Sequence, residues 1–251
     1  MGIPTMMPGL LPFKGLALGL LVGFSITCSA TVGAKDKETI YKPKIVAADF
    51  VPDISNKYFR FEPGDKFVFV QKGLTGTERI EVEVLKETRQ VMGVTVRVVR
   101  DRVWVDGVLK EDTRDWFAQD KAGNVWYFGE DVDNYKNGKL ADHKGAWQAG
   151  VDGAQPGIIM PANPVVGQTY RQEYYRGHAE DMATVLSLNE KVTVPRGTYT
   201  GCLMTKDFTP LDPTATERKY YCPQVGFVTL EEANWIVFKS RTELVSVTKD
   251  R

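Results

Sequence analysis

The chain has 251 residues, of which 43% are hydrophobic and 11% aromatic, and its 32 Lys and Arg balance its 32 Asp and Glu. This composition is typical of a globular protein with a substantial core. The balanced charge excludes a strongly basic surface of the kind that binds nucleic acids or anionic membranes.

A short apolar segment near the N terminus predicts export. Residues 15–26 form an apolar run after the single basic residue Lys14, and this run is shorter than the ~20 residues that a membrane-spanning helix needs. We therefore expect residues 1–34 to be a signal peptide that is cleaved after Ala30 or Ala34.

The same segment predicts where the protein acts. The residues before Cys28 do not match a lipoprotein signal, so we expect a periplasmic or secreted protein without a lipid anchor at Cys28. Cleavage removes only Lys14 among the charged residues and leaves 31 basic against 32 acidic residues. We expect neither a nucleic-acid partner nor an integral membrane protein.

The rest of the chain divides into an arm and one domain. Residues 35–57 are polar, contain Pro43 and Pro52 and show no sustained period, which predicts an irregular N-terminal arm. Residues 58–251 alternate between strand patterns and turn residues without a linker, which predicts a single antiparallel all-β domain. A curved sheet, an open barrel and a sandwich all fit this pattern.

The first strands of the domain carry local signals. Residues 58–61 and 66–71 predict a hairpin around the turn at Pro63 and Gly64. The apolar alternation slips at Val98 and Val99, which predicts a bulge or burial on both faces. Further strands are expected over residues 170–176, 184–194, 198–208, 217–222, 227–231, 235–239 and 242–247.

Residues 100–130 predict two hairpins in succession, with an unusual density of aromatic, Arg and carboxylate side chains. Asp106-Gly107 has the chemistry of a two-residue type I′ turn, so Val105 should face Val108. Ala122-Gly123 predicts the tip of the second turn. With both turns placed, the residues that face one another across the three strands can be worked out.

One face of these three strands is a candidate binding surface for an apolar or amphipathic ligand. In the expected register Arg102 lies opposite Glu111, and the arginines of this face keep its carboxylates ionised, including Asp115 opposite Glu130. The candidate ligand-binding residues are Arg100, Arg102, Trp104, Glu111, Asp115, Phe117, Trp126, Phe128 and Glu130.

The other face of the same strands is a candidate cation site. Three aspartates fall in one row in the expected register, and like charges opposite one another are destabilising in a sheet. Either a bound Ca²⁺, which prefers oxygen ligands, or relief by Arg114, Lys110 and solvent would stabilise the row. The candidate metal ligands are Asp101, Asp112 and Asp133 in the row, with Asp131 beside it.

The longest stretch without strand alternation is residues 150–164, with three prolines and three glycines. This composition predicts a loop of fixed shape. We expect the loop to form a lid or plug over one end of the β-structure, and the alternative is a crossover packed on the core.

Two cysteines remain after signal cleavage. Cys202 and Cys222 lie in strands on either side of the turn at residues 210–213, which places them close to opposite one another. In an oxidising compartment this arrangement predicts a disulfide. A metal or redox pair is the alternative, but the chain has no Cys-x-x-Cys spacing.

Catalytic signals are sparse. The sequence contains no Gly-x-Ser-x-Gly elbow and no His-Glu-x-x-His motif, and it has only two histidines. It therefore favours a non-enzymatic binding protein, while a carboxylate-based Ca²⁺ site that supports stability or hydrolysis remains the alternative. No other cofactor is expected.

Several long segments carry a resemblance. YFRFEPGDKFVFV, GAQPGIIMPANP, YRQEYY, AEDMA and YYCPQVGFV, together with the segment over residues 100–131, resemble an uncharacterised family of exported bacterial β-rich proteins. The aromatic strands at either end are also loosely similar to curved-sheet envelope proteins of the lipoprotein-carrier type. This resemblance implies an exported β-protein and implies no reaction. From the aromatic content of residues 100–130 we expect an apolar or amphipathic ligand, or an envelope protein, as the partner.

Overall fold

The computed structural model describes residues 41–73, 76–232 and 240–249, and strands make up most of this part of the chain. Its single helical element is the 3₁₀ turn η1 (Ala47–Asp49), and no helix among the described residues is long and apolar enough to cross a membrane. The all-β prediction is confirmed. The expected signal peptide and the expected strand over residues 235–239 lie outside the described residues.

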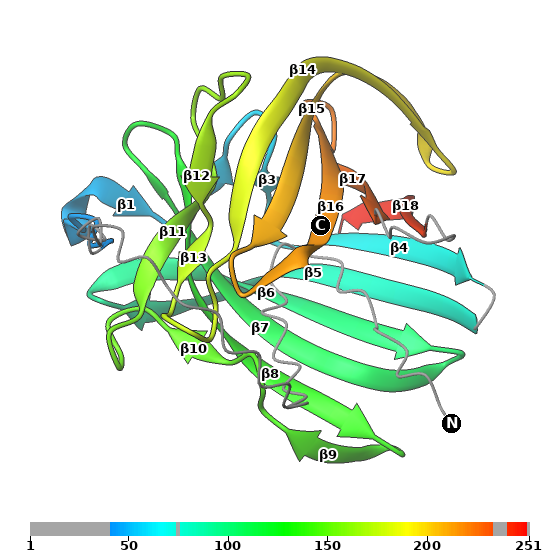
Figure 1. Cartoon of the computed structure of the whole chain (residues 1–251), viewed down its shortest axis with the longest axis horizontal. Coiled ribbons are helices and arrows are strands. Elements are labelled where there is room, and N and C mark those ends of the chain that lie inside the picture. Colours follow the sequence, from blue (N-terminus) through cyan, green and yellow to red (C-terminus); the bar gives the residue numbers. More distant parts are fainter. Residues whose placement is uncertain (1–40, 74–75, 233–239, 250–251) are drawn as a thin grey trace, which may run out of the picture.

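The strands form one large antiparallel sheet and one small one (Figure 1). In chain order the strands are β1 (Phe50–Val51), β2 (Ile54–Ser55), β3 (Arg60–Phe61), β4 (Asp65–Gly73), β5 (Gly76–Val91), β6 (Val94–Val105), β7 (Val108–Asp120), β8 (Val125–Lys136), β9 (Lys139–Asp142), β10 (Trp147–Gln148), β11 (Gln155–Met160), β12 (Thr169–Arg171), β13 (Glu173–Tyr174), β14 (Met182–Val194), β15 (Gly197–Thr209), β16 (Asp212–Cys222), β17 (Gly226–Glu232) and β18 (Arg241–Lys249).

The large sheet curls into a nearly closed barrel. Its strand order is β12-β14-β15-β16-β17-β18-β4-β5-β6-β7-β8-β11-β13. Only Gln172 separates β12 from β13 along the chain, so the two ends of this order meet. The short strands β1, β9 and β10 pair with β7 and β8, while β2 and β3 pair only with each other.

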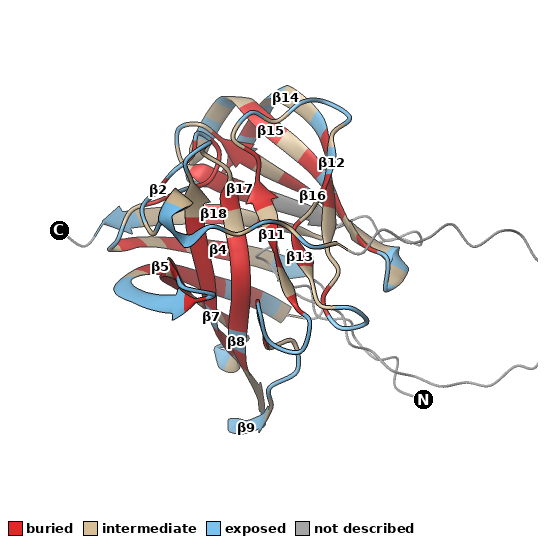
Figure 2. Ribbon diagram, turned by 90° about the vertical axis from the view of Figure 1, so that its left-hand side faces the viewer, coloured by how far each residue is buried: buried red, intermediate tan, exposed pale blue. Residues whose placement is uncertain are grey.

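Alternation of side chains explains the core. In β4, Phe67 and Phe69 point inward between half-buried neighbours, and in β5 Ile80 and Val82 do the same. Because successive strand residues point to opposite faces, each strand contributes every second residue to the interior. Figure 2 shows the resulting stripes of buried residues along the strands.

The N-terminal segment folds differently from the expected hairpin. β3 pairs with β2, whereas β4 pairs with β5 and β18, so the predicted pairing of residues 58–61 with 66–71 is wrong. Asn56 explains the alternative: its side-chain oxygen accepts hydrogen bonds from the backbone of Tyr58 and Phe59. The described part of the arm therefore contains a 3₁₀ turn and two short strands and is not irregular throughout.

A bulge near the first turn changes the register of β6 and β7. Asp106 and Gly107 both have positive φ, and Val105 faces Val108 as predicted. The register then shifts by one residue at Lys110, so that Arg102 faces Asp112 and not Glu111. A slip of one residue moves side chains to the opposite face of the partner strand.

The second hairpin keeps half of its predicted register. Asp115 faces Glu130, as expected. Nearer the turn the register shifts, and Phe117 faces Tyr127. Gly129 lies in this irregular stretch with a φ of 127°, and a Cβ there would come within 2.3 Å of the Trp147 carbonyl oxygen. The expectation that Trp126 and Phe128 share a face with Phe117 is therefore wrong.

Residues 150–164 form a strand and not a lid. β11 lies within this stretch and pairs with β8 on one side and β13 on the other. Ile159 and Met160 are fully buried. Gly157 allows the close approach of the neighbouring strand, because a Cβ there would lie 2.3 Å from the carbonyl carbon of Gln172. The alternative of a crossover packed on the core describes this segment better.

The predicted disulfide is confirmed. Cys202 of β15 and Cys222 of β16 are bonded, with their Cα atoms 4.2 Å apart. The neighbouring pair Leu203 and Tyr221 is in register across the same two strands. The bridge closes a loop of 20 residues, and by the loop-entropy model a loop of this size is worth about 3 kcal/mol of stability.

Candidate functional site

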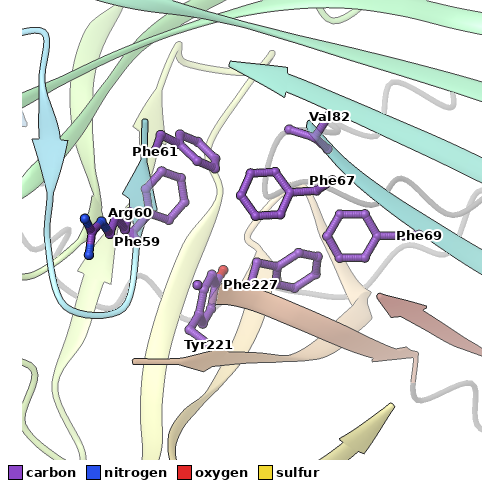
Figure 3. Close-up of a pocket in the computed structure, with 9 residues that line it drawn as sticks. Phe59, Arg60, Phe61, Phe67, Phe69, Val82, Tyr221 and Phe227 are labelled. Carbon is purple, nitrogen blue, oxygen red and sulfur yellow. The ribbon is translucent and has the colours of Figure 1, made fainter. Parts of the chain in front are cut away.

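The barrel interior contains a pocket lined by aromatic rings (Figure 3). Its empty space is about 360 Å³, including the part that opens to solvent. Between the rings there is room for about one water molecule. The lining residues are Phe59, Arg60, Phe61, Phe67, Phe69, Val82, Tyr221, Gly226 and Phe227.

The rings of this pocket come from distant parts of the chain. Phe61 of β3 packs on Phe67 of β4 with centroids 5.9 Å apart, and Phe69 packs on Phe227 of β17 at 5.2 Å. Tyr221 of β16 lies 5.4 Å from Phe227. Tilted aromatic pairs at such distances contribute about 0.5–1.5 kcal/mol beyond the burial of their area. The pocket wall is therefore both apolar and cohesive.

Charged side chains lie at the mouth of the pocket. Arg60 is 63% exposed and pairs with Glu62, and its guanidinium points away from the rings in Figure 3. Lys249 Nζ lies 2.8 Å from Glu62 Oε2. The hydrogen bonds from Lys249 and Arg60 lower the pKa of Glu62. The pocket thus joins an apolar floor to an ionised rim.

Two predicted site residues, Asp115 and Glu130, meet inside the barrel away from this pocket. They are opposite one another on β7 and β8, and both are buried. The Tyr127 hydroxyl donates a hydrogen bond to Asp115 Oδ1 at 2.9 Å. Within the described part of the chain, Asp115 Oδ2 and Glu130 Oε1 have no hydrogen-bond partner.

Burial changes the ionisation of this pair. Burial raises the pKa of Asp115 well above its usual range. Burial, and after it the charge of the facing Asp115, also raise the pKa of Glu130. Both side chains are therefore held as neutral carboxylic acids. A protonated pair can donate hydrogen bonds or move a proton, but neither residue lines the aromatic pocket.

The arginines that were expected beside this pair lie on the other face of the sheet. Arg100 Nε donates to Asp112 Oδ1 at 2.8 Å, and Arg102 Nη2 donates to Glu81 Oε2 at 3.1 Å. The bulge at Lys110 is the cause, because it changes which β7 residues share a face with β6. The predicted floor of paired charges is wrong.

Trp104 and Glu111 also lie apart from the pocket. The guanidinium groups of Arg79 and Arg102 lie 5.4 and 5.2 Å from the Trp104 ring, so Trp104 belongs to the outer charged face. Glu111 faces Val103 across β6 and β7. The charge of Glu111 raises the pKa of Asp115, so Glu111 lies near the buried pair of Asp115 and Glu130.

The remaining aromatic candidates pack beneath the N-terminal segment. Trp126 Nε1 donates to Asp120 Oδ2 at 2.8 Å. The ring of Phe50 in β1 lies 6.0 Å from Trp126 and 5.5 Å from Phe128. In contrast, Phe117 stacks on Tyr127 at 5.1 Å and contacts Phe59 and Phe61 of the pocket wall. Among the predicted aromatic residues, Phe117 lies closest to the pocket.

The predicted calcium ligands are not gathered in one place. Asp101 faces Thr113 and not Asp112, so the expected row of three aspartates is wrong. Asp112 faces Asp133 as predicted, but Asp112 is engaged by Arg100 and Asp133 lies 3.0 Å from His143 Nδ1. Asp131 is exposed and faces Arg114.

The structure therefore does not bring these four aspartates together as one set of ligands. Within residues 41–73, 76–232 and 240–249, no group of three or more His, Cys, Asp or Glu side chains is arranged to hold a metal ion. Calcium prefers six to eight oxygen ligands, and a set of aspartates divided between two faces does not fit this requirement.

Sequence reasoning missed a second polar cluster in the barrel. Lys219 of β16 is only 2% exposed, and its Nζ lies 3.2 Å from both Asp207 Oδ2 and Glu217 Oε2. Gln172 Nε2 also donates to Asp207 at 3.2 Å. Burial lowers the pKa of Lys219, but the charges of Asp207 and Glu217 more than offset this and raise it overall. The only available signal was the alternation of β16, which places Lys219 in phase with the inward-facing Tyr221.

Two more acids belong to this buried region. Burial and the nearby charge of Asp181 raise the pKa of Glu173 well above its usual range, although Trp147 lowers it in part. Burial also raises the pKa of Asp181 to about 7, against the opposing effect of Lys219. The interior is thus divided into an aromatic part and a polar part of largely protonated acids.

Comparisons with known proteins do not assign this chain to a family. No family model matches the chain, and no curated protein matches its sequence. A solved structure from Bacteroides fragilis, described as an exported protein with a YmcC-like fold, is 15% identical with a TM-score of 0.41, covering 76% of this chain and 99% of its own. A lipoprotein candidate from Parabacteroides distasonis is 13% identical with a TM-score of 0.39, covering 78% and 100%.

Proposed function

We propose that this protein is an exported, non-enzymatic binding protein that holds an apolar or amphipathic small molecule in the aromatic pocket. The observation that carries this proposal is the meeting of six aromatic rings around one opening beside Arg60. Pockets for small molecules are concave and mostly apolar. This one has an apolar lining that a ligand would have to open further, because the space between its rings holds about one water molecule.

The construction of the pocket supports entry of a ligand. Phe59, Arg60 and Phe61 form one wall, which belongs to the small β2–β3 pair and not to the barrel sheet. Because this wall is not part of the barrel's hydrogen-bond ladder, it can move without breaking strand pairing in the barrel. A ligand larger than one water molecule would displace this wall outward.

Export is supported by the chain itself. Residues 1–34 have the pattern of a cleaved secretory signal. The disulfide between Cys202 and Cys222 is of the kind that persists in oxidising compartments.

A fluorescent apolar probe tests the proposal. Mature protein, beginning after Ala34, should bind N-phenyl-1-naphthylamine saturably, with a blue-shifted emission that reports an apolar environment. Phe61→Ala removes a ring from the pocket wall and should raise the Kd of the probe at least ~5-fold. The reason is that contact with a buried ring contributes well over 1 kcal/mol to the binding free energy. Phe128→Ala removes a buried ring outside the pocket and is the control. Absence of saturable binding, or equal effects of the two variants, would contradict the proposal.

A further inference from the structure

Two tyrosine hydroxyls lie buried inside the barrel without a partner. Tyr221 is 1% exposed and Tyr170 is 8% exposed. Among the residues that the structure describes, neither hydroxyl has a hydrogen-bond partner. Buried hydroxyls in proteins are nearly always hydrogen-bonded, because desolvation without a partner costs free energy. Two such groups in one interior are therefore candidates for contact with a ligand.

Tyr221 joins the two parts of the interior. Its ring lines the aromatic pocket, 5.4 Å from Phe227 and 6.4 Å from Phe59. Its hydroxyl lies within the influence of the buried polar cluster, since the charges of Asp207 and Glu217 act on it. The hydroxyl therefore stands where the apolar pocket ends and the polar cluster begins.

Tyr170 lies near Tyr221, since the two interact electrostatically. The pKa of Tyr170 is raised by burial and by the nearby Asp207 and Tyr221. Burial likewise raises the pKa of Tyr221 well above its usual range. Both hydroxyls thus remain protonated near neutral pH and can donate a hydrogen bond.

We infer that the Tyr221 hydroxyl, with Tyr170 near it, is the hydrogen-bond donor of the pocket and recognises a neutral carbonyl group on a ligand whose apolar body lies among the rings. This inference rests on the proposed function and names the chemical class of its ligand: an apolar molecule that carries an ester, amide or ketone carbonyl.

The surrounding charges favour a neutral acceptor over an anion. Asp207 and Glu217 place negative charge near the hydroxyl, and Lys219, the nearby cation, is already in contact with both of them. A carboxylate or phosphate at this point would meet repulsion without gaining a new partner. A carbonyl oxygen needs only the donor that Tyr221 supplies.

A pair of naphthalenes of the same shape tests this inference. 2-Acetylnaphthalene and 2-ethylnaphthalene differ in one carbonyl, and each can displace N-phenyl-1-naphthylamine from the pocket. The wild-type protein should prefer the ketone by about tenfold, and Tyr221→Phe should abolish this preference while leaving the hydrocarbon's affinity within about twofold. Tyr170→Phe should reduce the preference to a smaller extent. Tyr135→Phe, on a half-buried tyrosine of β8 outside the pocket, is the control and should bind both probes like the wild type.

Thermal unfolding gives a second readout that does not depend on a ligand. If the hydroxyl has no partner in the free protein, Tyr221→Phe should leave the Tm unchanged or raise it by a few degrees. A fall of several degrees would show a structural hydrogen bond and overturn the inference. Equal affinity of the wild type for both naphthalenes would also overturn the inference, and so would an equal loss of affinity for both in Tyr221→Phe. In either case the proposed function would stand. No binding of N-phenyl-1-naphthylamine to the wild type would overturn the proposed function and this inference together.

Discussion

The two faces of the β6–β8 sheet carry similar charged residues in opposite states. On the outer face, Asp112 accepts a hydrogen bond from Arg100. On the inner face, Asp115 and Glu130 have raised pKa values and no arginine beside them. The two faces have similar compositions. The difference between their acids therefore comes from exposure to solvent and from the face on which each Arg side chain lies. Charge in a sequence therefore predicts an ion pair only when the face of each residue is known.

The largest expected effect concerns Lys219, a cation buried inside the barrel. Lys219→Met should lower the free energy of unfolding by about 3–5 kcal/mol, because it leaves Asp207 buried without its positive partner. Arg100→Met on the outer face should cost about 1 kcal/mol or less, since its side chain is 30% exposed to solvent. Urea denaturation of both variants measures the contrast. Equal losses would remove the distinction between the two faces.

The pH dependence of stability should reflect the inner acids. Asp181 has a folded-state pKa of about 7 against a usual value of 3.8, so the folded protein holds a proton that the unfolded chain releases near pH 4. Stability is therefore fully present below about pH 4 and is lost as the pH rises to about 7, by at most about 4 kcal/mol for this group. We expect a lower free energy of unfolding at pH 8 than at pH 5.

An Asp181→Asn variant is the control for this pH effect. The amide does not titrate, so the fall in stability between pH 5 and pH 8 should become shallower. Rim carboxyls such as Glu62, whose pKa is lowered by Lys249 and Arg60, act in the opposite direction and only at lower pH. A stability that rises from pH 5 to pH 8 would contradict the protonated state of the inner acids.

Neutral replacements should have opposite signs on the two faces. Glu130→Gln keeps the shape of a protonated acid but carries no proton that the unfolded chain would release at pH 8, so at that pH it should raise the free energy of unfolding by about 1 kcal/mol. Asp112→Asn removes the partner of Arg100 and should lower it by about 1 kcal/mol. Chemical denaturation at pH 8 checks both. A destabilised Glu130→Gln would mean that Glu130 is ionised and paired.

The smallest expected effect is that of calcium. Asp101 lies on the inner face, while Asp112 and Asp133 lie on the outer face and contact Arg100 and His143. Millimolar CaCl₂ should therefore shift the Tm by less than about 1 °C. A larger shift that Asp133→Asn abolishes would restore the cation site that was predicted from the sequence.

Local chemistry allowed much of the fold to be predicted. Asp106-Gly107 forms the turn that its positive φ preference requires. The strands β14, β15, β17 and β18 lie close to the segments that alternate in the sequence. The pairing of Cys202 with Cys222 followed from their positions about one turn.

The candidate site was predicted less well. Asp115 was correctly placed opposite Glu130. Phe117, one of the predicted binding residues, packs on Phe61 of the pocket wall. The pocket rings themselves were not predicted, because Phe61, Phe69 and Phe227 come together only when β3, β4 and β17 meet. The buried Lys219 was missed for the same reason: a lysine in an alternating strand gives no sign of which face is inside.

The sequence alone determined the all-β class, the tight turns and the disulfide, because each depends on the dihedral preferences and alternation of a few neighbouring residues. The tertiary structure alone decided which face of each strand is buried. One extra residue at Lys110 and one irregular stretch at Gly129 changed the register. Because side chains alternate between the faces of a strand, a shift of one residue moves a side chain between the charged outer face and the barrel interior.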